Sequence, residues 1–429
     1  MFDPASLPRA ATNLSEPKAS TPPASPLHSP ERPTDHIFVN NVRFLSMAAV
    51  VALHCVGVLP PLCGINGSSR LIYALGQPFK FGTIGFFLIS GFLMGEGLSR
   101  RSSSAYLTRR LKRVFAPWLV WFALYAALSL AHHVVTGRLS MDSLDGFRMI
   151  PGLVRIDLFS TAYWFVPNLM IAVSVLLLCR RFLYDPRLGC VLLGLSLFYG
   201  VNAYSQWIPI QNHSEAFLGF AFYLWLGAWT AKHFAAFMAW IARIPLLALL
   251  VLAVLTGLAA FGEAEVLTDR GAMNTLRISN QIYSVLAVLA IFKARGGLWP
   301  RALNVRASTF GIYLTHSVVL ALLINLSKPI PLQRVMGNAG IPAEAYAIVL
   351  LPGSFIATYL GSLAITQLLL RYPYLCWMVG GSKLGGAPKR TRAEEVRTPG
   401  QSFSFWRFPL PTHPASHLGL PTDSAGHGD

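Results

Sequence analysis

Apolar residues divide this chain into long hydrophobic stretches that are separated by short polar segments. A helix that crosses a bilayer needs about 20 mainly apolar residues. Ten stretches approach that length, namely residues 37–59, 79–96, 115–135, 163–179, 188–204, 216–237, 244–261, 276–292, 308–326 and 345–370. The pattern predicts an all-α polytopic membrane protein with about ten transmembrane helices.

The composition supports a membrane location. Of 429 residues, 54% are hydrophobic and only 12% are charged, whereas a soluble domain carries about 25% charged residues. The net charge of +17 comes from Lys and Arg residues that concentrate in alternate loops and near the C-terminus. By the positive-inside rule, both termini are predicted to be cytoplasmic, and we expect a multi-pass protein of the plasma or inner membrane. No basic block is interleaved with stacking aromatics, so no nucleic-acid partner is expected.

The two ends of the chain differ from its middle. Residues 1–36 are rich in Pro, Ser and Ala and contain no signal-peptide hydrophobic region, and the C-terminal segment is similarly rich in Pro, Gly and Ser. We predict disordered cytoplasmic tails over 1–36 and 376–429 and a transmembrane domain over 37–375. The five cysteines are scattered without metal-ligand spacing, so neither a metal site nor a disulfide framework is expected.

The first apolar stretch carries two ionisable residues, Arg43 and His54. Their separation of 11 residues places them within about 20° of the same helical face and about 16 Å apart along the axis. Lipid cannot solvate such a stripe, so we expect it to face protein or a water-filled cavity. A neutral imidazole there can take a proton from a hydroxyl or can be acylated transiently. Alternatively, the histidine only contacts headgroups or a neighbouring helix.

Six segments, in this order and with this spacing, resemble the integral-membrane acyltransferase-3 family. They are Arg43-(ten residues)-His54, GTIGFFLISGFLMG from residue 82, YLTRRLKRVFAPWLVW from residue 106, AYWFVPNLM from residue 162, FYLWLGAWTAK from residue 222 and STFGIYLTHSVVL from residue 308. The resemblance covers roughly residues 35 to 374. It implies an enzyme that transfers an acyl group, often acetyl or succinyl, from a coenzyme A thioester to a hydroxyl of a glycan or related cell-surface acceptor. It also implies acyl-coenzyme A as co-substrate with no bound cofactor, and membrane lipid as a further partner.

The resemblance implies that His54 and Arg43 are catalytic. His54 would take the proton of the acceptor hydroxyl, and Arg43 would orient the acyl donor or hold a buried acid that supports His54. The chain lacks two acids that many members have, one before Phe86 and one a turn after Trp164. The carboxylate partner of His54 therefore stays open. The remaining acids near helix ends are Asp157, Glu215, Glu263, Glu265 and Asp269.

Three arginines, Arg109, Arg110 and Arg113, lie just before the third apolar stretch. Guanidinium groups match phosphate oxygens in a bidentate manner, and coenzyme A carries a pyrophosphate and a ribose phosphate. Arg110 and Arg113 share a helical face and match a family motif, so the cluster is predicted to bind the donor. Alternatively, it only follows the positive-inside rule.

Three further residues are candidates for binding the acceptor. His316 matches the late Tyr-Leu-x-His pattern of the family and is predicted to bind the acceptor, to complete a relay, or to hold its helix against the first one. Trp164 and Asn168, four residues apart, can offer an aromatic platform and an amide to a sugar, although an interfacial Trp belt explains Trp164 as well.

The sequence leaves two other functions open. A transporter or flippase of glycan or lipid intermediates is the alternative function, and a sensor or scaffold is the third. The oligomeric state is left open.

Overall fold

The computed structural model describes residues 37–99, 101–139, 144–210, 212–267, 271–294, 296–327 and 338–381. Within these ranges the protein is all-α and has no strand. Its helices are α1 (Ile37–Cys63), α2 (Arg70–Gly76), η1 (Gln77–Phe79), α3 (Phe81–Leu98), α4 (Ser103–Arg110), η2 (Leu111–Phe115), α5 (Ala116–Val135), α6 (Leu144–Ser160), η3 (Ala162–Trp164), α7 (Phe165–Leu178), η4 (Arg180–Phe182), α8 (Pro186–Ser205), η5 (His213–Glu215), α9 (Ala221–Lys232), α10 (Phe234–Arg243), α11 (Leu246–Leu267), α12 (Ile278–Lys293), α13 (Val305–Ser327), α15 (Ala343–Arg371) and η6 (Cys376–Val379). Of the predicted tails, residues 1–36 and residues 382–429 lie outside the described residues.

The fold is that of a polytopic membrane protein, as predicted, but the count of about ten spans is not confirmed. In the described ranges, seven helices are long and apolar enough to cross a membrane, and α6 with η3 and α7 forms an eighth only if a pair bent by 80° counts as one span. Two predicted spans are too short. The stretch 216–237 breaks at His233 into α9 and α10, and α12 has only 16 residues.

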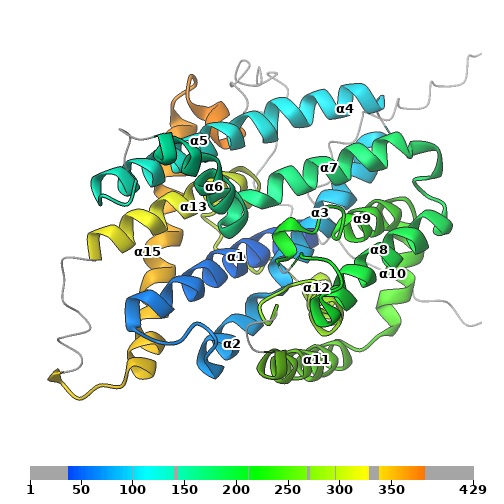
Figure 1. Cartoon of the computed structure of the whole chain (residues 1–429). Coiled ribbons are helices and arrows are strands. Elements are labelled where there is room, and N and C mark those ends of the chain that lie inside the picture. Colours follow the sequence, from blue (N-terminus) through cyan, green and yellow to red (C-terminus); the bar gives the residue numbers. More distant parts are fainter. Residues whose placement is uncertain are drawn as a thin grey trace, which may run out of the picture. The chain divides into compact units, whose positions relative to one another are not determined.

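The spanning helices fall into an inner and an outer group. The most apolar part of α13 is 67% buried and that of α1 is 50% buried, compared with 17% for α11 and 11% for α15. Figure 1 shows α1 running between the other helices, with α11 at the edge of the bundle. Outer helices expose apolar side chains such as Leu247 and Val254, as helices that face lipid do.

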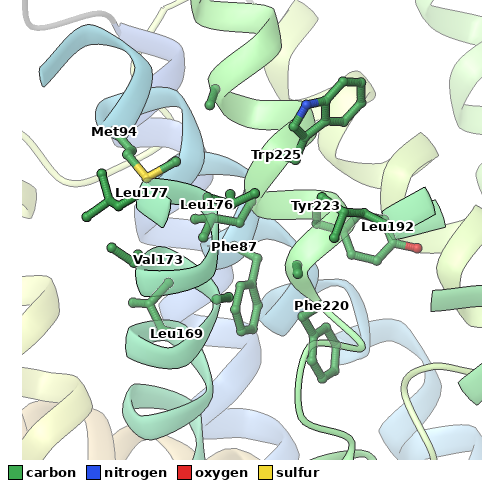
Figure 2. Close-up of a cluster of buried hydrophobic side chains, with 14 of the residues drawn as sticks. Phe87, Met94, Leu169, Val173, Leu176, Leu177, Leu192, Phe220, Tyr223 and Trp225 are labelled. Atoms are coloured by element: carbon green, nitrogen blue, oxygen red, sulfur yellow. The ribbon is translucent and has the colours of Figure 1, made fainter. Parts of the chain in front are cut away.

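Helices α3 and α9 make a particularly close contact. A Cβ added at Gly91 would lie 1.9 Å from the Leu224 carbonyl oxygen, and one at Gly227 would lie 2.0 Å from that of Leu88. Only glycine permits this approach, which is common where membrane helices meet. Beside it, side chains from α3, α7, α8 and the start of α9 form the main apolar cluster (Figure 2). This packing fixes the helix ends that carry the site.

The transmembrane domain continues past residue 375. Cys376 and Val379 of η6 are buried, and the Trp121 indole donates a hydrogen bond to the Met378 carbonyl at 2.9 Å. Residues 376–381 therefore belong to the helical domain rather than to the predicted tail.

Candidate active site

A cavity of about 330 Å³ opens between α1, α3, α13 and three connecting segments. Its size lies in the range of small-molecule sites. The three connecting segments join helices at ends that lie far along the sequence from the loops rich in Lys and Arg. The lining residues combine apolar, hydroxyl, imidazole and amine groups: Val50, Leu53, His54, Lys80, Thr83, Phe86, Phe159, Ser160, Thr161, Ala162, Trp164, Phe165, Asn212, His213, Ser214, Met273 and Tyr313.

One wall of the cavity is the break between α6 and α7. Thr161 caps the turn, because its hydroxyl donates to the Asp157 carbonyl at 2.7 Å and accepts the Tyr163 amide at 3.2 Å. Two tyrosines then tie this break to α13. Tyr313 Oη donates to the Ala162 carbonyl at 2.7 Å, and Tyr163 Oη donates to the Leu314 carbonyl at 2.9 Å. These reciprocal hydrogen bonds hold two walls of the cavity in register.

The structure brings together the two histidines that the sequence singled out. The ring of His54 lines the cavity, and its centroid is 5.3 Å from that of His316. His316 is fully buried and is not among the lining residues. Its Nδ1 lies 2.7 Å from the Tyr313 carbonyl, which fixes Nδ1 as the donor and leaves the lone pair of the neutral ring on Nε2. Nε2 is buried without a hydrogen-bond partner in the described part of the chain.

None of the carboxylates considered as a partner for His54 is bonded to it in the described ranges. Each has a partner elsewhere: Glu263 accepts from Arg277 and Tyr204, Glu265 from Arg70, Glu215 from Arg155 and Asp157 from Ser129. Asp269 lies outside the described residues. A neutral histidine, His316, occupies the place beside His54 where a carboxylate was sought.

Arg43 lies elsewhere on α1. It is absent from the cavity lining, and its Nη1 donates to Asn40 Oδ1 at 3.4 Å. The predicted axial separation of about 16 Å, or three turns, is enough to place Arg43 outside the cavity that His54 borders, even if the two residues share a helical face.

Of the predicted residues Trp164 and Asn168, only Trp164 borders the cavity. Trp164 lines the cavity, with its ring 5.1 Å from that of His213 in an edge-to-face arrangement. Asn168 does not line the cavity: its Nδ2 donates to the Ser214 carbonyl at 2.9 Å and to the Trp164 carbonyl at 3.3 Å. The amide thus holds η5 in place, and in this conformation it does not reach the space where a ligand would lie.

The sequence analysis missed two cavity residues, Lys80 and His213. Lys80 is 2% exposed, and its ammonium donates to the Met273 carbonyl. His213 lies in η5, and its Nδ1 accepts the Thr275 amide at 3.4 Å. Burial, followed by the positive charge of Lys80, lowers the pKa of His213 to about 3. Lys80 had a signal, because it is a lysine within a predicted span, whereas His213 lies in a polar loop that gives none.

The arginine cluster forms a separate, shallow surface. Arg109 and Arg113 border a hollow with Ser104, Ala105, Thr108 and Lys112. Arg110 turns away, since its Nε donates to Tyr106 Oη at 3.0 Å and its guanidinium lies over that ring. Of the three predicted arginines, Arg109 and Arg113 therefore border this hollow, and Arg110 does not. Arg109 and Arg113 are four residues apart, a spacing that puts two side chains side by side on a helix.

A helical membrane protein with paired histidines at a small mixed-polarity cavity has the features of an intramembrane enzyme rather than of a scaffold. The family model described as an acyltransferase domain, Acyl_transf_3, matches residues 36–381. The chain therefore belongs to the acyltransferase-3 family and is a multi-pass membrane acyltransferase. Neither the curated proteins nor the solved structures give a match.

Proposed function

We propose that this protein transfers an acyl group, acetyl or succinyl, from acyl-coenzyme A to a hydroxyl of a glycan or related cell-surface acceptor. Acyl-coenzyme A serves as co-substrate, and no resident cofactor is required. One observation carries the proposal: His54 borders the cavity while a second neutral histidine stands beside it. The hydroxyls and aromatic ring of Thr83, Ser160 and Trp164 in the same cavity suit a sugar.

In the proposed reaction, His54 acts as general base. It takes the proton of the acceptor hydroxyl as the hydroxyl oxygen attacks the thioester carbonyl. The tetrahedral intermediate then collapses, the carbon–sulfur bond breaks, and the imidazolium returns the proton to the leaving thiolate. His316 is proposed as a positioning residue. Its buried Nε2 has no donor in the described structure, so a small movement of the adjacent His54 ring would let His54 donate an N–H to it and present its other nitrogen to the acceptor.

Arg109 and Arg113 are proposed to bind the phosphates of the donor on the cytoplasmic side. The acceptor cavity lies at the other ends of the helices, and the two hollows share no lining residue. The thioester must therefore reach His54 along the helices that separate them. We propose that the pantetheine arm, which is long and narrow, covers this distance.

The reaction is tested with purified protein in lipid nanodiscs. Acyl-labelled acetyl- and succinyl-coenzyme A are supplied with methyl glycosides as hydroxyl acceptors, and the ester product is measured by mass spectrometry. We expect product with the native protein and with His233→Ala, whose ring stacks on Trp229 away from the cavity. His54→Ala should form almost none. Equal product from His54→Ala would remove this residue from the chemistry.

The sidedness of the proposal is tested by labelling in intact cells. In a background that lacks the five native cysteines, a cysteine at Gly67 should react with an impermeant reagent, and one at Ser104 should be protected. Both positions are exposed on the protein surface. Reversed accessibility would place the arginines outside the cell, where acyl-coenzyme A is absent.

A further inference from the structure

Lys80 is an unusual residue for this cavity. Among the described residues that line it, Lys80 is the only lysine or arginine, and none is an aspartate or a glutamate. It is 2% exposed, and its ammonium donates one hydrogen bond within the described part of the chain, to the backbone carbonyl of Met273. An ammonium has three protons to donate, and burying it without a counter-ion is costly.

Within the described ranges, the surrounding charges do not supply a counter-ion. Arg277, fully buried nearby, is a second cation, and its Nη1 is 2.9 Å from Glu263 Oε2. The Glu263 carboxylate also accepts hydrogen bonds from Tyr204 and Ser279. This acid is therefore engaged by Arg277 and two hydroxyls, and no other described carboxylate balances the positive charge of Lys80 in the cavity lining.

The position of Lys80 is fixed by its neighbours. Gln77 Nε2 donates to Asn280 Oδ1 at 2.8 Å, and Asn280 Nδ2 donates to the Asn274 carbonyl at 3.0 Å. These bonds tie η1, which precedes Lys80, to the segment that carries Met273. Such support is expected for a group that binds a ligand with defined geometry.

We propose that the molecule acylated or transferred in this cavity carries a single carboxylate that pairs with Lys80 while its reacting atom lies at His54. The inference rests on the proposed acyl transfer and specifies its substrate. A carboxylate carries one negative charge and matches one lysine, whereas a phosphate monoester carries about −1.5 to −2 and would leave excess charge buried. Two sources supply this chemistry: the distal carboxylate of a succinyl group, or the acid group of a uronic acid in the acceptor.

Binding is measured first, because it does not depend on turnover. The thermal stability of the nanodisc protein is recorded with two matched pairs: methyl glucuronoside and methyl glucoside, and the succinyl and butyryl thioesters of N-acetylcysteamine. A ligand that binds the folded state raises the unfolding temperature. We expect one charged probe to raise it more than its neutral partner does, and the pair that responds identifies the source of the carboxylate.

Variants then test whether Lys80 causes the difference in unfolding temperature between charged and neutral probes. Lys80→Gln should abolish the difference between charged and neutral probes, and Lys80→Arg should retain part of it. Lys232→Gln is the matched control, because that ammonium lies over the Tyr184 ring outside the cavity. Equal stabilisation by charged and neutral probes overturns the proposal, and so does a difference that survives Lys80→Gln.

Transfer assays with the same pairs separate this proposal from the proposed function. In Lys80→Gln, kcat/KM for the charged substrate should fall at least tenfold more than kcat/KM for the neutral one. Efficient transfer with no preference in either pair overturns the carboxylate site and leaves acyl transfer standing. Charged-probe binding that needs Lys80, with no transfer from any donor, supports the anion site and contradicts the proposed reaction.

Discussion

The cavity and the arginine surface are built in opposite ways. The cavity holds Lys80, which is 2% exposed, and the fully buried His316 lies behind His54 in its wall. The walls are joined by the hydrogen bonds of Tyr163 and Tyr313. On the arginine surface, Arg109 and Arg113 are exposed and project from one continuous helical segment. The first region is preorganised by packing, whereas the second offers mobile charges to a ligand that must bind and leave.

This difference separates the tasks of the two regions. Acid–base chemistry needs atoms held in a fixed geometry, and a buried pair of rings provides it. Binding a highly charged donor needs only complementary charge, which exposed guanidinium groups supply at the cost of sensitivity to salt. Substitutions in the cavity should therefore change turnover, and substitutions on the arginine surface should change donor affinity.

The largest effect is expected for His54→Ala. Loss of a positioned general base should lower kcat about 100-fold or more. The unfolding temperature should change little, because the ring borders a cavity rather than filling the core. Initial rates with labelled donor, compared with those of His233→Ala, measure the effect. Near-normal turnover in folded His54→Ala protein would contradict the assignment and make His316 the next residue to test.

A smaller effect is expected at the arginine surface. Arg113→Ala should weaken donor binding about tenfold, near the lower end of the range of about 1.5–3 kcal/mol for a hydrogen bond to a charged group, because the site is exposed. Arg109→Ala should behave alike, and Arg110→Ala should lose less, since that side chain is held by Tyr106. Titration of acetyl-coenzyme A at low and high salt measures the affinities. A larger loss for Arg110→Ala than for Arg109→Ala would restore the pairing predicted from the sequence.

The sequence predicted the two regions unequally, and the reason is physical. His54 was found because an ionisable residue within an apolar stretch is rare and conspicuous, whereas His316 was found because it matches a family pattern. Arg43 was placed with His54 because periodicity gives angles well, but it does not tell how deep a cavity extends along a helix. That Arg110 leaves the hollow depends on its contact with the Tyr106 side chain, which spacing alone does not reveal. His213 enters the cavity through tertiary packing of a loop, which no local pattern reveals.

The span count shows the same limit. Apolar length predicted α1, α13 and α15 well, because each is continuous. It failed for 216–237, where a break at His233 divides an apolar run into two short helices that pack against their neighbours. Hydropathy shows which residues can lie in a membrane, but it does not show where a helix ends within a continuous apolar stretch.

The tyrosine bonds that hold the cavity walls give the next prediction. Tyr163→Phe removes the hydrogen bond to the Leu314 carbonyl and leaves that acceptor buried, which should cost about 1–3 kcal/mol. Turnover should also fall, because the bond holds α13 and therefore His316 against the break after α6. Tyr223→Phe is the control, since its hydroxyl is also buried and donates to Gln281 Oε1, outside this cavity. Loss of stability with unchanged turnover would show that the wall does not position the chemistry.

The effect expected from His213 lies in stability rather than in turnover, as a dependence on pH. Its pKa is about 3 in the folded protein, below the ordinary value of 6.5. Between these values the unfolded chain binds a proton that the folded protein does not, so the stability of the folded protein rises with pH and is lost as the pH falls from 6.5 toward 3.

His213→Gln removes the titrating group and keeps an oxygen that can accept the Thr275 amide. The unfolding temperature of the variant should therefore fall less than that of the native protein between pH 6.5 and pH 4. Because the other titrating groups are common to both proteins, the difference between the two curves isolates His213. A steeper fall in the variant would mean that His213 is charged in the folded state and pairs with an acid.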